Sequence, residues 1–303
     1  MLVPLYNISL TNTTKWRQNG ITILSDDFNF QDTMDIDDND TIFICRHIKG
    51  QVEEWQNNFT SRRIVAGGNG NGSETNQLSM PLDMIIYKKN HSIIICDGGN
   101  RRIVQWSLQN TTSGHVIISN IDCYGLAIDD RDDLYVSDHL KHEVRRWNMK
   151  TYENIVVAGG NGPGEDSTRL LQPTFLFITK DYSLYVADTQ NSRIMKWIFN
   201  AKQGILIAGG YGQGDLLIQL YRPKTMIVDH SDNLYATDPS YNRIMRWNNG
   251  ATEGSIVVGG NQNGNQSNQV NQPVDFVFDK YNNLYVLNTF NTRRLQKFYR
   301  ASN

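Results

Sequence analysis

Pairs of aspartate and arginine five residues apart are the first arrangement in this sequence that could do chemistry. The pairs are Asp97 with Arg102, Asp188 with Arg193, and Asp238 with Arg243. A carboxylate beside a guanidinium accepts strong charge-assisted hydrogen bonds, and in a cleft such a pair could also act on a substrate. One active site does not need several copies of the same pair. We therefore predict that these residues form structural clamps, in which an aspartate at one strand end holds the arginine that begins the next strand.

The pairs belong to a longer repeated stretch, typified by SLYVADTQNSRIMKW at Ser183–Trp197. Six copies of this stretch follow one another, and their second strands begin at Ile42, Ile93, Leu134, Leu184, Leu234 and Leu284. The last four copies are spaced by fifty residues. Self-similarity at a period of 20–50 residues indicates a solenoid, a propeller or an array.

Each copy reads as four short strands bounded by Gly, Pro, Asn or Asp, which is the pattern of an all-β repeat. In the fourth copy we expect strands at Phe175–Ile178, Leu184–Ala187, Arg193–Ile198 and Gly204–Ala208. The first strand is continuously apolar, which is typical of a strand covered on both faces. Radially arranged sheets bury their innermost strands in this way.

The repeat predicts an all-β fold, a six-bladed β-propeller of four-stranded antiparallel blades that forms a single domain over residues 1–303. The predicted blades span residues 26–80, 81–121, 122–171, 172–221 and 222–271, and the last combines 272–303 with 15–25. The sixth copy has no fourth strand of its own, and Lys15–Leu24 resembles the missing segment. We expect this N-terminal strand to close the ring and to remove two open sheet edges.

The combination YVAD-x-x-N-x-R-I-x-x-W, VVAGGNG-x-G and QL-x-x-P resembles the NHL repeat over nearly the whole chain. The resemblance implies a six-bladed propeller and extends to enzymes, RNA-binding modules, substrate adaptors of ubiquitin ligases and extracellular interaction domains. Three copies depart from its Asp–Arg pattern: Arg46 faces Gln51, Asp138 faces Glu143, and Asn288 faces Arg293–Arg294 with a shift of one residue. Any specific site is expected among these copies, above all at Arg46–His47 and Asp138–Glu143.

Two further motifs have a structural interpretation. The Gly-rich segments Gly67–Gly72, Gly159–Gly164, Gly209–Gly214 and Gly259–Gly264 follow strands, but no helix follows them to present amides to a phosphate, so we predict turn-forming links. Asp35, Asp37 and Asn39 have the spacing of a calcium loop. The segment lacks the later glycine and glutamate of an EF-hand, which favours a solvated turn.

Metal and nucleophilic chemistry receive less support from the sequence. The resemblance implies that a peptidyl-hydroxyglycine amidating lyase would hold zinc on histidines in the channel, and His47, His139 and His142 are the candidates here. Only His47 and His139 are equivalent, fewer than the three ligands of a typical catalytic zinc site. No G-x-S-x-G motif is present. No cofactor is predicted, with zinc and calcium kept as alternatives.

Composition limits the remaining classes. The 303 residues are 39% hydrophobic and 20% charged with a net charge of −2, which suits a packed domain and disfavours nucleic-acid binding through overall charge. No apolar run is long enough to span a bilayer. The N-terminal residues do not resemble a secretory signal, so we expect an intracellular protein or a part of a longer one. Three cysteines do not make a disulfide framework, and we expect buried free thiols at Cys45 and Cys96, and no partner for Cys123.

These observations lead to a preferred function, that of a monomeric, non-catalytic interaction module. We expect it to bind a protein or glycan through its loop-rich face, with RNA disfavoured and no membrane insertion. The expected binding residues are His47, Lys49, Asn100, Arg101, His139, Lys141, His142, Asn191, Tyr241 and Phe290. The alternatives are a metal-dependent lyase or hydrolase and the RNA- or substrate-binding domain of a multidomain ubiquitin ligase. Asn-x-Ser/Thr sequons slightly favour an extracellular setting over a cytoplasmic one, and they lie at Asn7, Asn12, Asn39, Asn58, Asn71, Asn90, Asn110 and Asn265.

Overall fold

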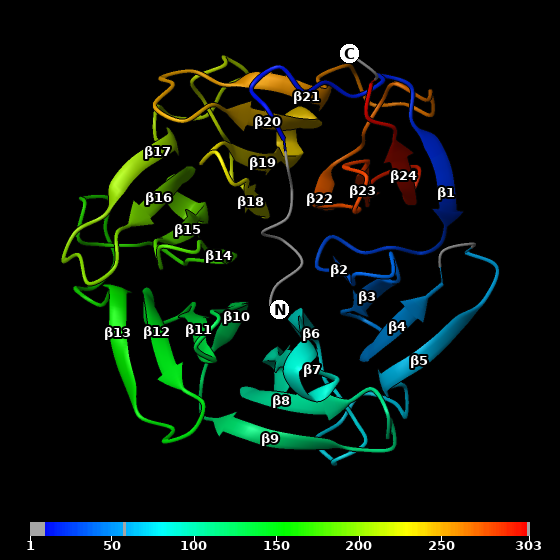
Figure 1. The fold of residues 1–303 in the computed structure, drawn as a ribbon, viewed down its shortest axis with the longest axis vertical. Helices are drawn as coiled ribbons and strands as arrows, with labels where there is room; N and C mark the ends of the chain where they lie inside the picture. The colour runs from blue at the N-terminus through cyan, green and yellow to red at the C-terminus, as the bar shows by residue number, and fades with distance from the viewer. Residues whose placement is uncertain (1–9, 57–58, 302–303) are drawn as a thin grey trace.

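Six four-stranded antiparallel sheets surround a central axis in the computed structural model, which describes residues 10–56 and 59–301 (Figure 1). The first strand of each sheet lies nearest the axis. The predicted six-bladed propeller is therefore confirmed. The sequons at Asn7 and Asn58 lie outside the described residues.

The strands follow the predicted order, with bounds shifted by a residue or two. Blades one and two are β2 (Thr33–Ile36), β3 (Ile42–Arg46), β4 (Gln51–Trp55), β5 (Arg62–Gly67), β6 (Pro81–Tyr87), β7 (Ser92–Asp97), β8 (Arg102–Ser107) and β9 (Gly114–Ser119). Blades three and four are β10 (Cys123–Ile128), β11 (Asp133–Asp138), β12 (Glu143–Asn148), β13 (Asn154–Gly159), β14 (Leu176–Ile178), β15 (Leu184–Asp188), β16 (Arg193–Trp197) and β17 (Ile205–Gly209). Blades five and six are β18 (Met226–Val228), β19 (Leu234–Asp238), β20 (Arg243–Trp247), β21 (Ser255–Gly259), β22 (Pro273–Phe278), β23 (Leu284–Asn288), β24 (Arg294–Phe298) and β1 (Ile21–Ser25).

Short 3-10 turns occupy several of the hairpins. They are η2 (Lys88–Asn90), η3 (Gly98–Asn100), η4 (Thr189–Asn191) and η5 (Pro239–Tyr241). None of the described residues forms a helix that is long and apolar enough to cross a bilayer.

The ring closes as the sequence predicted, because β1 pairs antiparallel with β24 in the sheet of β22, β23 and β24. Trp16, which precedes β1, is 4% exposed and donates its indole N–H to the Asn282 carbonyl at 2.8 Å. The N-terminal strand thus supplies the outer edge of the last blade, and Figure 1 shows β1 beside β24.

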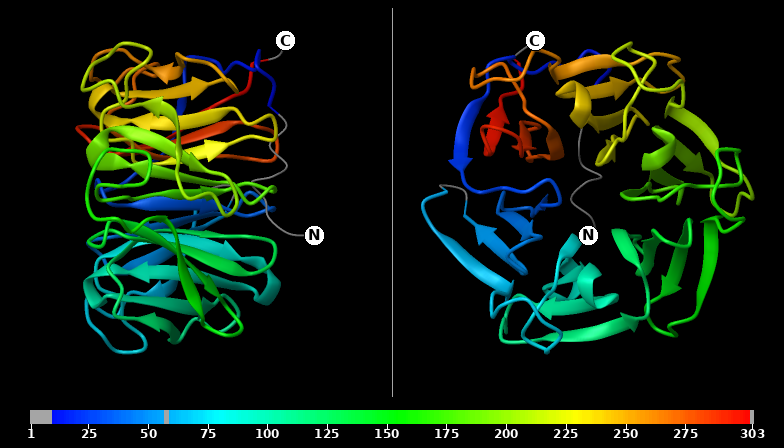
Figure 2. Two further views of the ribbon diagram at one scale, coloured as in Figure 1. Left: turned by 90° about the vertical axis from the view of Figure 1, so that its left-hand side faces the viewer. Right: turned by 180° about the vertical axis from the view of Figure 1, so that it is seen from behind.

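The core lies between neighbouring sheets. The inner strands β14, β18 and β22 are buried along their whole length, as the continuously apolar first strand of the fourth copy predicted for β14. The side view in Figure 2 shows strands crossing the thickness of the ring, so that turns and links gather on its two faces. One face, here called the loop face, carries the Gly-rich links and the turns between second and third strands. The other carries the turns between first and second strands.

The links between blades need glycine for a steric reason. Gly209 has a φ of +72°, and a Cβ there would lie 2.3 Å from the Ser192 carbonyl oxygen. A side chain therefore fits neither the backbone conformation nor the space. The Gly-rich segments are tight links in the structure, and no helix follows any of them within the described residues.

Candidate binding face and channel mouth

The Asp–Arg pairs tie blades two, four and five to the links that enter them. Arg193 Nε lies 2.7 Å from Asp188, and the other guanidinium nitrogens donate to the carbonyls of Glu165, Asp166 and Arg169. Asp97 with Arg102 and Asp238 with Arg243 form the same ion pair at 2.7 and 2.9 Å. Burial raises the pKa of Asp238 to about 6, against hydrogen bonds from Arg243. These pairs are buried, and the guanidinium N–H groups already donate hydrogen bonds to the protein. We call this Asp–Arg arrangement the brace.

Two of the predicted binding residues belong to this brace. Asn100 Nδ2 donates to Asp97 and to the Gly72 carbonyl, both at 2.8 Å. Asn191 repeats the arrangement with Asp188 and Gly164. Their amide groups hold the turn against the link, so their polar atoms face the protein.

Blade one reverses the polarity of the brace. Arg46 occupies the aspartate position, and its side chain is 1% exposed among Asp26, Asp32 and Glu53, with N–O distances of 3.0 to 3.1 Å. Burial acts to lower the pKa of Arg46, but these carboxylates raise it above its usual value. The departure at Arg46 is thus compensated by local acids, and its guanidinium is not available to a ligand.

Blades three and six depart from the pattern differently. In blade three Glu143 pairs with Arg145 Nε at 2.6 Å, and Asp138 lies 3.4 Å from Lys141 Nζ. In blade six Asn288 lies opposite Arg294 in register, because the turn is one residue longer than in blade four. Arg294 Nε is buried without a hydrogen-bond partner, and burial lowers the pKa of Arg294.

The three histidines proposed as zinc ligands use ring nitrogens to bind backbone. His47 Nδ1 is 3.1 Å from the Pro81 carbonyl, and His139 Nδ1 is 3.2 Å from that of Pro173. Thr189, the equivalent residue of blade four, donates to the Pro223 carbonyl at 2.9 Å. Histidine and threonine at this position therefore do the same work, joining a turn to the next blade. His142 Nδ1 accepts from the Gln172 amide.

Most cations of the loop face are neutralised locally. Lys49 lies 2.8 Å from Asp27, and Arg101 makes two hydrogen bonds of 2.6 and 2.9 Å to Asp122. Tyr241 is half-buried beside Arg243, and Phe290 is 42% exposed. Of the predicted binding residues, these two present aromatic surface to solvent.

Exposed aliphatic side chains of the loop face were missed at the level of sequence. Ile48 is 62% exposed and Leu140 is 60% exposed, and each is the second residue of its turn, as Phe290 is in blade six. Met80, immediately before β6, is 55% exposed. The detectable signal was an apolar residue at a position where other blades carry Gly99, Gln190 or Ser240.

The segment between β1 and β2 reaches toward the central axis on this face (Figure 1). Gln31 accepts a hydrogen bond of 2.6 Å from Tyr124 of blade three, and the Phe30 carbonyl accepts one from Lys224 of blade five. Phe30 itself is 44% exposed. Blades one, three and five are therefore joined through this segment.

Buried charges lie directly beneath. Burial lowers the pKa of Lys224 to about 8 and raises that of Asp275 to about 7, and it raises the pKa of Asp83 strongly. Asp275 accepts from the Met34 amide and Asp83 from the Leu126 amide, so each carboxylate bridges to the next blade. These groups hold inner strands together. No three His, Cys, Asp or Glu side chains form a metal-ligand set in the part of the chain that the structure describes.

Two sequence interpretations change. Cys96 and Cys123 form a disulfide with Cα atoms 5.9 Å apart, so the prediction that left both without a partner is wrong. The end of β7 lies beside the start of β10 in the next blade. A comparison of equivalent positions in the repeats does not reveal that these two strand ends meet. Cys45 is a buried free thiol as predicted. Asp35 belongs to β2 and accepts from the Ile86 amide, whereas Asp37 caps the following turn, so the calcium-like spacing is divided between two structures.

The fold resembles several solved propellers, and no protein-family model or curated protein matches the chain in sequence. An auxiliary nutrient binding protein from Bacteroides thetaiotaomicron is 12% identical, with 96% of this chain and 78% of that chain covered and a TM-score of 0.72. Virginiamycin B lyase from Staphylococcus aureus is 11% identical, with 91% and 97% covered and a TM-score of 0.60. A chain of the nidogen–laminin complex is 15% identical, with 74% and 76% covered and a TM-score of 0.58. At these identities the likeness establishes the six-bladed propeller and nothing finer.

Proposed function

We propose that this propeller is a non-catalytic interaction module that binds a protein partner through the loop face. The observation that carries the proposal is the set of exposed apolar side chains at Ile48, Met80, Leu140 and Phe290. Exposed apolar residues gathered on one face, surrounded by polar ones, are typical of protein interaction surfaces. The aliphatic members favour a protein over a glycan.

The polar groups on this face support the same class of function. Its histidines and its Asn100 and Asn191 amides bind backbone, and Lys49 and Arg101 bind carboxylates. These groups are therefore already engaged by the protein, and part of the positive charge that could attract nucleic acid is paired with carboxylates. The nidogen–laminin relative is itself a propeller found in a protein complex.

Site-specific photo-crosslinking tests the proposal. Benzoylphenylalanine is placed at Leu140 or Phe290, and at Tyr281 as a control, since Tyr281 is 66% exposed in a turn of the opposite face. We expect both loop-face positions to crosslink the same protein in an extract of the producing cells. Excess wild-type protein should compete, whereas a correctly folded Leu140→Asp, Phe290→Asp double variant should not.

Equal crosslinking from Tyr281, or equal competition by the double variant, would refute the loop face as the docking surface. Binding to a glycan array that is lost in the double variant would refute the protein class and identify a sugar ligand instead.

A further inference from the structure

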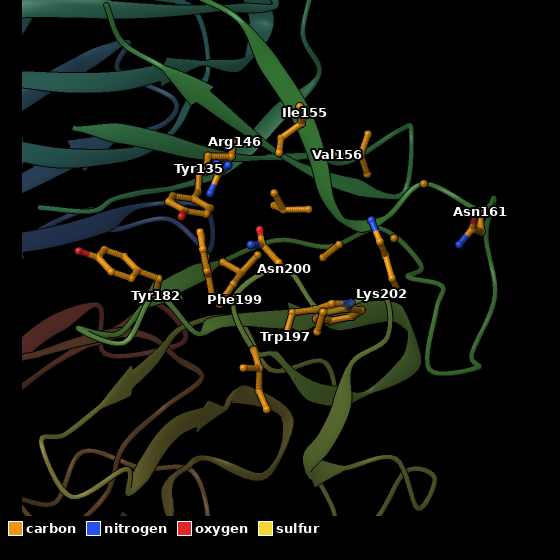
Figure 3. Close-up of a pocket in the computed structure, with 17 residues that line it drawn as sticks. Tyr135, Arg146, Ile155, Val156, Asn161, Tyr182, Trp197, Phe199, Asn200 and Lys202 are labelled. Carbon is orange, nitrogen blue, oxygen red and sulfur yellow. The ribbon is translucent and has the colours of Figure 1, made fainter. Parts of the chain in front are cut away.

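A groove lies between blades three and four on the outer part of the ring, with a volume of about 510 Å³ (Figure 3). One wall is β13 with Ile155 and Val156, and the other is the link after β16, with Phe199 and Lys202. Figure 3 shows side chains from these two walls on either side of the groove. The volume is within the range of small-molecule sites, roughly 300–1,000 Å³.

Because the blades repeat every fifty residues, this groove can be compared with the equivalent groove between the next two blades. A second groove of about 350 Å³ lies between blades four and five, and nearly all of its lining residues are those of the first shifted by fifty positions. The shared residues, such as Trp197 and Trp247, belong to the general geometry of neighbouring blades. Only the differences can make the first groove specific.

The first difference is aromatic and apolar surface on the wall formed by the link after the third strand, whereas on the opposite wall the second groove has Tyr211 where the first has Asn161. Phe199 and Ile198 stand where the second groove has Asn249 and Asn248. Ile198 is 52% exposed and Phe199 is 37% exposed, facing Ile155, which is 52% exposed. Solvent therefore reaches an apolar surface that folding leaves uncovered.

The Phe199 ring is held in place. Its centroid lies 5.7 Å from that of Tyr182, and the guanidinium carbons of Arg131 and Arg146 lie 4.9 and 5.4 Å from it. Arg131 in turn lies 3.6 Å from the Tyr182 centroid. Stacking of this kind orients the aromatic surface before any ligand arrives.

The second difference is charge. The first groove is lined by Arg146 and Lys202 and, among the described residues, by no Asp or Glu, whereas the second is lined by Lys196 and Asp232. Arg146 Nε lies 3.6 Å from Asp133 Oδ2, so the positive charge of Arg146 is partly balanced by this carboxylate. Lys202 is exposed and forms no ion pair with any described residue, so its ammonium group is available at one end of the apolar surface.

We propose that the groove between blades three and four binds a small organic anion with an aromatic body. The body packs between Phe199 and the Ile155–Val156 edge, and the acid group pairs with Lys202. This site is separate from the loop face and does not depend on it.

The fluorescent anion 8-anilino-1-naphthalenesulfonate is a suitable probe, with uncharged N-phenyl-1-naphthylamine as its neutral counterpart. The test variants carry the residues of the second groove, Phe199→Asn and Lys202→Thr, and the matched controls are Asn249→Ala and Thr252→Ala. The Leu140→Asp, Phe290→Asp double variant controls for dye on the loop face. Circular dichroism melting establishes that each variant is folded.

We expect saturable binding of one anion per chain. Phe199→Asn should weaken it about tenfold through loss of stacked apolar surface, and Lys202→Thr about threefold to tenfold, with a reduced salt dependence. The neutral dye should be insensitive to Lys202→Thr, and the control variants should bind as the wild type does. Absence of saturable binding, or binding changed only by the loop-face double variant, would overturn the proposal.

Discussion

Arg46 and Glu53 form an ion pair of 3.1 Å between Nη1 and Oε2, and both side chains are almost completely buried. In blade four the corresponding brace has the opposite arrangement, with Asp188 holding Arg193. Arg46 stands at the position of Asp188, but its partner Glu53 lies two residues beyond Gln51, the residue that corresponds to Arg193. In a buried ion pair each charge balances the other. Removal of one partner leaves an unbalanced buried charge and lowers the stability of the fold.

We therefore predict that Arg46→Met destabilises the protein by about 3–5 kcal/mol, because Asp32 and Glu53 are left buried without their cation. Urea unfolding measures the loss. The control is Glu54→Gln, which removes an exposed pair with Arg63 and should cost about 1 kcal/mol or less. The double variant Arg46→Met, Glu53→Met should recover part of the loss. A cost for Arg46→Met no greater than that of the control would contradict this account.

Stability should fall as pH rises from about 4 to about 7 because of Asp275. The folded pKa of about 7 lies above the ordinary value for aspartate, so the folded protein keeps a proton that the unfolded chain releases. This contribution is complete below about pH 4 and is lost as pH passes 7. Lys224, with its pKa lowered to about 8, acts mainly above that window.

The measurement compares wild type with Asp275→Asn by urea unfolding at pH 4.5 and pH 7.5. Asn cannot ionise, so the variant should lose less stability than the wild type over this interval, by at least about 1 kcal/mol. The exposed Glu165→Gln variant should follow the wild type. Parallel curves for wild type and Asp275→Asn would show that the buried carboxylate does not titrate in this range.

Thiol counting tests the bond between Cys96 and Cys123. Denatured, unreduced protein should show one reactive thiol, that of Cys45, and three after reduction. The disulfide closes a segment of 27 residues, so Cys123→Ser should cost about 3–4 kcal/mol under oxidising conditions. Three thiols without reductant, in protein kept from reducing agents, would contradict the pairing.

Closure of the ring predicts that deletion of residues 1–25 causes unfolding or self-association. The deletion removes β1 and exposes β24 as an open edge, which is a template for pairing with other chains. Trp16→Ala keeps the strand but removes a buried indole, and it should lower stability by about 3–5 kcal/mol without association. Light scattering and thermal melting distinguish the two. A truncated monomer with an unchanged melting temperature would refute the closure.

The sequence allowed the fold to be predicted more completely than the candidate site. The repeat pattern predicts all six blades, and the recurrence of the pair of Asp188 with Arg193 predicts a structural clamp. His47 and His139 could not be interpreted from type alone, since a histidine that binds a neighbouring backbone carbonyl and one that binds a metal look alike in sequence. Ile48 and Leu140 were missed because an apolar residue in a turn gives no signal until its exposure is known.

The sequence by itself determined the architecture, because burial periodicity and turn chemistry act over a few residues and repeat with every blade. Only the tertiary structure decided which charges are compensated and which cysteines meet. Glu53 neutralises Arg46 from the next strand, and Cys123 reaches Cys96 from the next blade. Such relationships depend on the offset between neighbouring strands and sheets, which packing sets and residue spacing along the chain does not encode.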